Sequence, residues 1–422
     1  MAEPTYRYLA ALVDGGGTVP PELGAVRRLV ERGHQVTVLA EDSMAAEVAH
    51  TGAHLVPWDQ APNRQSRSPE DDPYRDWECK NPLTLLQRLI ERQFVGPAPL
   101  YAAEVTRALE ERRPDAVLCS AFTMGSMVAA EAAGVPFAVM LPNAYILPVE
   151  GMPPFGSGLK PARQPVTRAV HRALRAASTK AMDRGLPGLN RLRTDYGLDP
   201  LAHLWDQLHQ ADLELVMTSK VFDFEGAVPP HARYVGPVLD DPPWAERWTP
   251  PPGDDPLVLV AMSSTYQEQY GCLERVVTAL ADLPVRGLVT AGPALDATVI
   301  PSPPNVTVVQ SAPHNQVLRH ARVVITHGGH GTVVKSLAAG VPLLVLPHGR
   351  DQGDNAARVS ARGAGLSLRR TARPARITAA LRRLMDDPRY VSAARTLGEH
   401  IRADAAAPTL VTEVERLATV SR

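Results

Sequence analysis

Short apolar runs alternate with amphipathic segments along this chain, a pattern typical of parallel sheets covered by helices. Residues 8–13, YLAALV, form an unbroken apolar run that suits a strand buried on both faces. A glycine turn follows, and the next segment opens with two prolines and repeats apolar residues at helical spacing until Gly33. A second apolar run, VTVLA, occupies residues 36–40. We therefore predict a β-α-β unit over residues 8–40.

A similar sequence occurs once in each half of the chain. AAGVPFAVMLP at residues 132–142 is matched by AAGVPLLVLP at residues 338–347, an offset of 206 residues (338 − 132). A duplicated architecture explains this match; the alternative is coincidence, because a glycine that ends a helix before a new strand is common in α/β proteins. The length of 422 residues also fits two domains of about 100 to 200 residues each.

A proline-rich segment at residues 229–256 lies between the halves, and its prolines exclude regular structure. We place the domain boundary near residue 240. Two other irregular stretches, residues 60–82 and 142–165, predict long loops of the kind that carry ligand contacts; the alternative for the first is a flexible insertion. The fold class is therefore α/β, with parallel sheets and a ligand crevice at the carboxyl ends of their strands.

Charge and cysteine content remove several classes of function. The formal charge is −1, from 44 Lys and Arg against 45 Asp and Glu, so we expect neither nucleic acid nor an anionic membrane as a partner. The three cysteines are far apart and form no C-x-x-C pair, which argues against a disulfide framework or a zinc knuckle. No run of about 18 apolar residues and no signal peptide is present. We expect a cytoplasmic protein.

The heptapeptide THGGHGT, residues 326–332, is the strongest candidate site. The β-branched run at residues 322–326 predicts a strand, and residues 332–340 predict a helix, so the glycines form the turn between them. Such a turn presents free backbone N–H groups, and glycines let an anion approach closely. We therefore predict a diphosphate site in which His327 donates a hydrogen bond. The alternative is an ordinary glycine turn with a core histidine.

Two other strand ends carry polar residues. DQGDNA follows the next predicted strand, where Asp351 and Gln352 suit hydrogen bonds to sugar hydroxyls; the alternative is an N-terminal cap for the helix at residues 355–363. Ser263, Ser264 and Thr265 follow the strand VLVAM and suit a phosphate, although by themselves they indicate only a loop.

Taken together, H-x-G-x-G-T, GVP and DQ-x-x-NA resemble the donor-binding signature of inverting, metal-independent, family-one GT-B glycosyltransferases. The resemblance is to the bacterial natural-product branch, which includes enzymes of antibiotic and macrolide biosynthesis, and it covers nearly the whole chain. It implies two Rossmann-like domains whose parallel sheets face an interdomain cleft. By this resemblance residues 1–240 bind the acceptor, residues 241–405 bind the donor, and a helix in residues 406–422 returns to the N-terminal domain.

The resemblance also assigns donor contacts. Ser311 stands where the family often has a stacking tryptophan, so the base contact should rest on Ala312 and His314. The residues assigned to the donor are Ser263, Ser264, Thr265, Ala312, His314, His327, Gly329, His330, Gly331, Thr332, Asp351 and Gln352. The donor would be a UDP- or dTDP-sugar. We expect no cofactor and no bound metal, because no D-x-D pair is present to hold one on the diphosphate.

The catalytic positions depart from the family pattern. Where the family has a histidine base and an orienting aspartate, this chain has Thr18 and Ser120, and a hydroxyl is not a base at neutral pH. Three accounts remain open. Asp14, or else Glu22, substitutes as the base, although Asp14 equally suits a role in holding the glycine turn; the acceptor is a phenol or another acidic group; or the protein is a non-catalytic helper.

The remaining expectations concern partners. By resemblance the protein is a hexosyltransferase acting on a small-molecule acceptor, with Asn143 and Tyr145 as acceptor contacts, and a homodimer stays open. A sugar-nucleotide epimerase is the alternative within the same fold. A dinucleotide-binding oxidoreductase is disfavoured, because Pro20 stands where G-x-G-x-x-G would require its last glycine.

Overall fold

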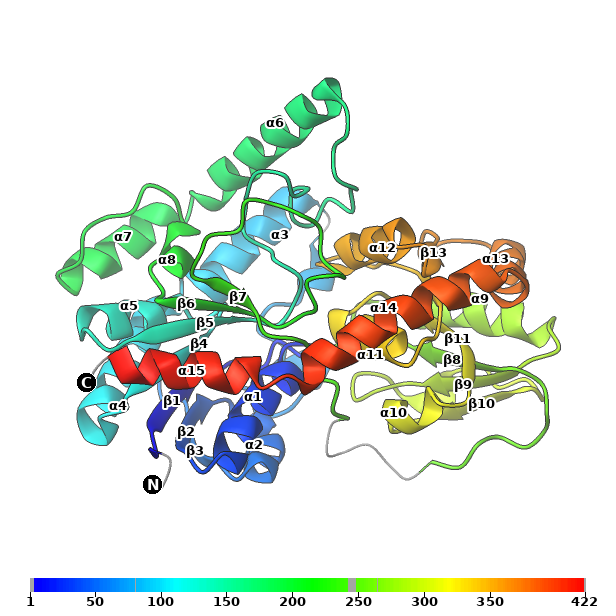
Figure 1. Cartoon of the computed structure of the whole chain (residues 1–422), viewed down its shortest axis with the longest axis horizontal. Coiled ribbons are helices and arrows are strands. Elements are labelled where there is room, and N and C mark those ends of the chain that lie inside the picture. Colours follow the sequence, from blue (N-terminus) through cyan, green and yellow to red (C-terminus); the bar gives the residue numbers. More distant parts are fainter. Residues whose placement is uncertain (1–3, 80, 242–247, 264, 421–422) are drawn as a thin grey trace.

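Two parallel β-sheets, each covered by helices on both faces, make up the molecule (Figure 1). The structure is a computed structural model of the chain, and it describes residues 4–79, 81–241, 248–263 and 265–420. Ser264 and the linker residues 242–247 therefore lie outside the described residues. Two Rossmann-like units of this kind form the GT-B fold, as the sequence predicts.

The N-terminal sheet has seven strands in the order β3-β2-β1-β4-β5-β6-β7, and every neighbouring pair is parallel. The strands are β1 (Arg7–Ala11), β2 (Gln35–Ala40), β3 (His54–Pro57), β4 (Ala116–Ser120), β5 (Phe137–Leu141), β6 (Leu213–Val216) and β7 (Ala232–Tyr234). The helices are α1 (Val19–Glu31), α2 (Ala45–Thr51), α3 (Pro82–Leu89), α4 (Ala98–Arg112), α5 (Met124–Ala132), α6 (Pro165–Met182), α7 (Leu186–Asp195) and α8 (Asp206–His209).

The C-terminal sheet has six strands in the order β10-β9-β8-β11-β12-β13, again all parallel. The strands are β8 (Leu257–Ala261), β9 (Arg286–Thr290), β10 (Val306–Val309), β11 (Ala321–Thr326), β12 (Leu343–Val345) and β13 (Gly365–Ser367). The helices are α9 (Tyr270–Ala281), α10 (His314–Val317), α11 (His330–Ala338), α12 (Gln352–Ala361), α13 (Pro374–Asp386), α14 (Pro388–Ala406) and α15 (Thr409–Val420).

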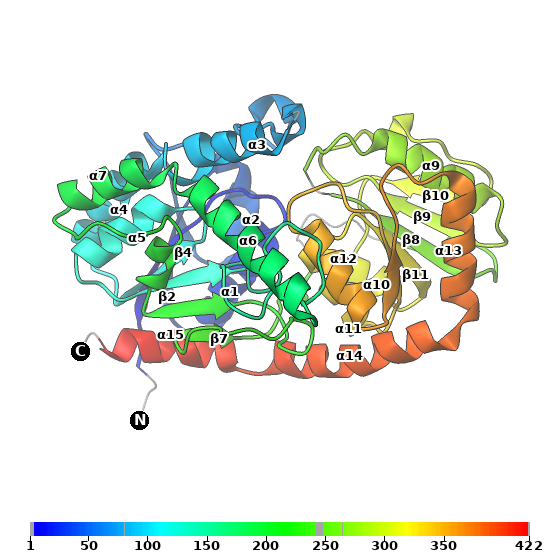
Figure 2. The same cartoon turned by 90° about the horizontal axis from the view of Figure 1, so that it is seen from above.

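Helix α15 ties the two halves together. It continues from α14 along the side of the molecule and ends on the N-terminal sheet (Figure 2). There Leu410 and Val414 join the core that contains Tyr8 of β1 and Leu29 of α1. The terminal helix thus buries apolar surface of the N-terminal half, so the relative placement of the halves depends on it.

The predicted elements at the diphosphate turn agree with the structure, although their ends differ. Strand β11 ends at Thr326 as predicted, but α11 begins at His330, two residues before the predicted start. Helix α12 begins at Gln352, three residues before the predicted start, with Asp351 at its N-cap position. Helix α11 therefore begins within the motif THGGHGT, and helix α12 begins within DQGDNA. Part of each polar motif thus forms the first turn of a helix, next to the end of the preceding strand. Within the described part of the chain, no helix is long and apolar enough to cross a membrane.

Candidate active site

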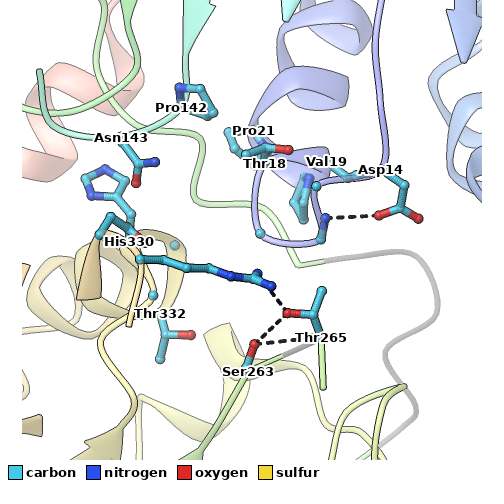
Figure 3. Close-up of a pocket in the computed structure, with 18 of the residues that line it drawn as sticks. Asp14, Thr18, Val19, Pro21, Pro142, Asn143, Ser263, Thr265, His330 and Thr332 are labelled. Atoms are coloured by element: carbon cyan, nitrogen blue, oxygen red, sulfur yellow. Dashed lines mark hydrogen bonds between the residues drawn. The ribbon is translucent and has the colours of Figure 1, made fainter. Parts of the chain in front are cut away.

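The carboxyl ends of both sheets border one cleft. It holds a cavity of about 440 Å³, and both halves of the chain line it. Figure 3 shows Asp14 and Thr18 on one wall and Ser263, Thr265 and Thr332 on the other. The predicted residues that line the cavity are Asp14, Thr18, Asn143, Ser263, Thr265, Ala312, His314, His327, Gly329, His330, Gly331, Thr332, Asp351 and Gln352. Ser120 and Tyr145 are not among them.

The glycine turn between β11 and α11 forms the floor of the donor wall. Gly328 has a φ of 102°, a backbone conformation that favours glycine, and this reverses the chain between strand and helix. A Cβ atom placed on Gly331 would meet no atom within 4 Å, so the backbone there faces open cavity. The first turn of α11 has no intrahelical acceptor for its N–H groups, which makes this floor suited to an anion.

His327 follows β11 and is 8% exposed. Burial lowers the pKa of its imidazole to about 3, and the neighbouring His348 lowers it further. The ring is therefore neutral at pH 7 and offers a hydrogen bond rather than a charge. It packs against the turn, since a Cβ atom on Gly329 would lie 2.6 Å from His327 Nε2. His327 thus lines the cavity, and its ring packs against the backbone of the glycine turn at Gly329.

His330 is the first residue of α11 and is 7% exposed. Neither ring nitrogen makes a hydrogen bond of normal geometry among the described atoms, although Asn355 and the Met217 backbone lie close by; the ring lies 5.8 Å from that of Phe222 between centroids. Burial lowers the pKa of His330 to about 4, so this imidazole is neutral as well. A buried polar ring at a helix N-terminus is suited to contact a ligand.

The loop after β8 carries a compact hydrogen-bonded network. Ser263 Oγ lies 3.1 Å from Thr265 Oγ1, and Gln267 Nε2 donates to Ser263 Oγ at 2.9 Å. Arg350 Nη1 donates to Thr265 Oγ1 at 3.0 Å, and Arg350 Nε contacts Asp76 of the opposite half at 2.7 Å (Figure 3 shows the contacts at Ser263 and Thr265). A cation thus spans the cleft beside the hydroxyl groups.

Asp351 and Gln352 lie beside this network. Gln352 Oε1 accepts from the backbone N–H of His348 at 2.7 Å, and its Nε2 donates to Gln267 Oε1 at 2.8 Å. Its amide therefore braces the loop as well as lining the cavity. Asp351 is partly exposed to the cleft, and desolvation raises its pKa to about 6; Asn355 donates to Asp351 Oδ2 at 2.7 Å.

The far end of the donor wall is suited to a flat ring. Ala312 is buried beneath the cavity, and His314 Nε2 lies 3.3 Å from Thr290 Oγ1. Burial lowers the pKa of His314 to about 4, and the Lys335 ammonium lowers it further. Lys335 Nζ also lines the cavity and contacts Asp241 Oδ1 at 3.2 Å. Ser311 lines the same region, without the aromatic surface that the family often has there.

On the acceptor wall, both carboxylate oxygens of Asp14 accept hydrogen bonds. Its Oδ1 accepts from the Gly16 N–H at 3.0 Å, and its Oδ2 accepts from Ser43 at 2.9 Å and Arg67 at 2.7 Å. Burial alone would raise the pKa of Asp14, but the Arg67 guanidinium outweighs it and lowers the pKa. A carboxylate stabilised in this way is a weak base. The geometry favours the alternative in which Asp14 holds the glycine turn.

The structure places Ser120 beneath the cleft rather than in the cavity lining, and its catalytic role stays a prediction. Ser120 is the last residue of β4 and has no exposed surface, because its face of the strand packs against α1. Beneath the cleft it neighbours Glu22, a carboxyl group that is also fully buried. Burial raises the pKa of Glu22 to about 8; the Ser120 hydroxyl opposes that rise and Asp14 adds to it. Only Thr18 of the two replaced catalytic positions reaches the cavity.

The two predicted acceptor contacts, Asn143 and Tyr145, differ in whether they line the main cavity. Asn143 lines the cavity, whereas Tyr145 lines a small side pocket that Asn143 and Asp351 share. The Tyr145 hydroxyl donates to Glu214 Oε2 at 2.8 Å, so it points away from the main cleft. The assignment of Tyr145 as an acceptor contact stays a prediction, and its hydrogen bond directs the ring toward Glu214 of β6.

An apolar surface completes the acceptor wall. The ring of Phe94 lies 5.8 Å from that of Phe122 and 5.4 Å from that of Trp205, between centroids. All three line the cavity together with Leu89 and Ile146. Aromatic and aliphatic walls of this kind are typical of pockets for flat apolar ligands. The sequence offered no signal for this surface, because its members come from separated helices and loops.

Two polar residues of the donor wall were also missed. Arg350 directly precedes the D-Q pair, and its φ of 54° turns the side chain back across the cleft. Gln267 follows the hydroxyl cluster by two residues and joins it to Gln352. Their position next to recognised motifs was the only signal available in the sequence.

The chain is similar to known proteins of natural-product biosynthesis. Residues 275–417 match the family described as erythromycin biosynthesis protein CIII-like, C-terminal domain. The chain is 28% identical to 4'-demethylrebeccamycin synthase of Lentzea aerocolonigenes, over 94% of this chain and 96% of that protein. It is 27% identical to demethyllactenocin mycarosyltransferase of Streptomyces fradiae, over 80% of this chain and 70% of that one.

A solved structure gives the same picture. The crystal structure of CalG4, the calicheamicin glycosyltransferase, superposes with a TM-score of 0.77 at 26% identity and covers 99% of both chains. Its likeness extends over both halves and the cleft between them. By its fold and these similarities the protein is a GT-B glycosyltransferase, and it is similar to glycosyltransferases of bacterial natural-product pathways.

Proposed function

We propose that the protein transfers a sugar, with inversion at the anomeric carbon and without a metal ion, from a UDP- or dTDP-sugar to a phenolic or otherwise acidic small molecule. One observation carries the proposal: a single cavity joins the glycine turn at Gly331 to Thr18 and the apolar wall. A nucleotide sugar and a flat acceptor can share that space. Relatives from antibiotic pathways with 27–28% identity support the substrate classes.

The donor end supplies neutral hydrogen-bond donors for the diphosphate. The backbone N–H groups at the start of α11 and the neutral imidazole of His327 face the cavity. Each hydrogen bond to a charged oxygen is worth about 1.5 to 3 kcal/mol, so several of them hold a nucleotide without a metal. Arg350 and Lys335 add positive charge at the two sides of this region.

The reaction is an in-line displacement. The acceptor oxygen forms a bond to the anomeric carbon on the face opposite the diphosphate, while the bond from that carbon to the phosphate oxygen breaks. The nucleoside diphosphate leaves with the bonding electron pair, and its negative charge develops against the α11 amides. Stabilising that charge at the glycine turn is the main contribution that this chain makes to the rate.

The acceptor must lose a proton with little help. Thr18 is not a base, Asp14 is held by Arg67, and Glu22 lies below the cavity with Ser120. A phenol ionises near pKa 10, far more readily than an alcohol, and its ring suits the wall of Phe94, Phe122 and Trp205. We therefore assign phenols as the preferred acceptors, with Thr18 beside the attacking oxygen.

The test is incubation of the purified protein with UDP-glucose or a dTDP-sugar, with and without a panel of phenols. Nucleoside diphosphate release that depends on the acceptor supports transfer. Donor isomerisation without an acceptor would support an epimerase, and tight nucleotide binding with no product would support a non-catalytic helper. The test includes the helper because the two carboxyl groups considered as the base are engaged or buried: Asp14 accepts from Arg67, and Glu22 has no exposed surface.

Metal independence is tested in the same assay. Activity should survive EDTA, because neutral amides and side-chain donors take the place of a cation on the diphosphate. Loss of transfer in EDTA, with recovery on addition of magnesium, would contradict the proposed mechanism.

A further inference from the structure

A second polar cluster lies outside the cleft, at the amino ends of β6 and β7. His209 ends α8, Glu214 lies in β6, and His231 directly precedes β7. His209 Nδ1 lies 2.6 Å from Glu214 Oε1, and His231 Nε2 lies 3.2 Å from the same oxygen. None of the three lines the catalytic cavity.

The set has the composition of a metal site. One atom from each residue lies within 4.8 Å of the other two, and this is the only such group among the residues that the structure describes. Two imidazoles and a carboxylate are typical zinc ligands, at about 2.0 to 2.2 Å from the ion. Ligands at those distances from a tetrahedral ion lie a little more than 3 Å apart, so only small side-chain shifts are needed.

Burial makes a cation at this place favourable. The Glu214 side chain has no exposed surface, and an isolated buried carboxylate is costly. The two histidine side chains are each 29% exposed, so an ion can enter from solvent and keep a water ligand. The same openness leaves both rings free to move apart as the ion enters.

The carboxylate is also oriented as a metal ligand requires. The Tyr145 hydroxyl donates to Glu214 Oε2 at 2.8 Å, while Oε1 faces the two imidazoles. A hydrogen bond to the oxygen that is not coordinated fixes the ligand and tunes it, as is usual around protein metal sites. The Tyr145 N–H in turn donates to Asp223 at 2.7 Å, which pairs with Arg358 of the donor half at 2.7 Å.

We propose that His209 Nδ1, Glu214 Oε1 and His231 Nε2 bind a divalent transition-metal ion, zinc by preference, with Tyr145 as the group that orients the carboxylate. The ion clamps α8 to β6 and β7. Through Tyr145, Asp223 and Arg358 it also supports the contact between the two halves. Its role is structural, so it is independent of the transfer reaction in the cleft.

The experiment uses the full chain, treated with EDTA, dialysed and titrated calorimetrically with zinc chloride. We expect one strong site per chain and a higher thermal midpoint with zinc, because an ion that binds the folded state stabilises it. His209→Ala and His231→Ala should each weaken zinc binding by about 100-fold or more and abolish the thermal shift. Tyr145→Phe should weaken binding by about 10-fold, the range seen for groups that orient ligands.

His203→Ala is the matched control. His203 Nδ1 also pairs with a carboxylate, that of Asp183 at 2.9 Å, but without a second histidine, so its loss should leave zinc binding unchanged. Anomalous scattering from zinc-soaked crystals should place the ion among the three side chains. Absence of a strong site, or equal zinc affinity in wild type and in both single histidine variants, would overturn the proposal and leave the two histidines only as hydrogen-bond partners of Glu214. Sugar transfer remains measurable in either case.

Discussion

The two walls of the cleft treat their polar groups in opposite ways. On the donor wall, backbone N–H groups, Ser263, Thr265 and Asp351 face the cavity. On the acceptor wall, the carboxyl groups are either neutralised by arginine, as in Asp14, or buried below the surface, as in Glu22. In the proposed mechanism this difference assigns leaving-group stabilisation to the backbone of the donor wall, and it leaves acceptor activation to the chemistry of the acceptor itself.

The sharpest test of the donor wall is Gly331→Val. Its side chain would meet no protein atom but would enter the space assigned to the diphosphate, so the fold should persist while nucleotide binding falls by about 100-fold or more. Calorimetric titration with UDP and dTDP measures the effect. The control is Gly271→Val, at the same second position of α9 but outside the cavity, which should bind normally. Equal affinity in both variants would move the diphosphate elsewhere.

His327→Ala should weaken nucleotide binding by about 10-fold or more, because it removes one neutral donor to a charged oxygen. The affinity loss should be the same at pH 6 and pH 8, since burial keeps the pKa of His327 at about 3 and the ring is neutral throughout that range. His400→Ala, an exposed histidine of α14, serves as the control. Unchanged nucleotide affinity in His327→Ala would remove its phosphate role.

On the acceptor wall, Thr18→His tests whether this position adjoins the reacting oxygen. An imidazole there would supply the missing base, and the rate with aliphatic alcohol acceptors should rise by about 10-fold, less than the roughly 100-fold or more that a fully aligned general base gives. Rates with phenols should change less, because phenols need less help. Product formation across a matched panel of alcohols and phenols measures the change. An acceptor profile identical to wild type would place Thr18 away from the attacking oxygen.

The smallest expected effect concerns the carboxyl group below this wall. Because burial raises the folded-state pKa of Glu22 to about 8, the unfolded chain releases this proton at lower pH than the folded chain. Wild-type stability should therefore fall as pH rises from about 4.5 to 8, and Glu22→Gln should remove that loss. We expect the variant to gain about 1 to 3 kcal/mol at pH 8 and little at pH 4.

Denaturant unfolding at the two pH values measures this gain. Glu41, whose pKa burial raises to about 7, titrates in both proteins, so the difference isolates Glu22. A Glu22→Gln gain that is the same at pH 4 and pH 8 would mean that folding does not raise the pKa of Glu22.

Sequence patterns predicted the donor wall well because its determinants are local. A β-branched run, a glycine turn and an amphipathic helix specify β11, the diphosphate turn and α11 within about 20 residues. The predicted first residues of α11 and α12 were less accurate, because the side chains of His330 and Gln352 suit either a loop or a first helical turn. For Ser264 the assignment to the phosphates stays a prediction, since it lies outside the described residues.

The sequence by itself determined the duplicated α/β architecture and the glycine turn between β11 and α11, since both follow from hydrophobic period and glycine placement. Only the tertiary structure decided which polar groups face the cleft. Arg67, 53 residues from Asp14, neutralises that carboxylate, and packing of α1 buries Ser120. Tyr145 turns to Glu214, 69 residues away. Burial and charge pairing arise from contacts between distant segments, and a local pattern does not contain them.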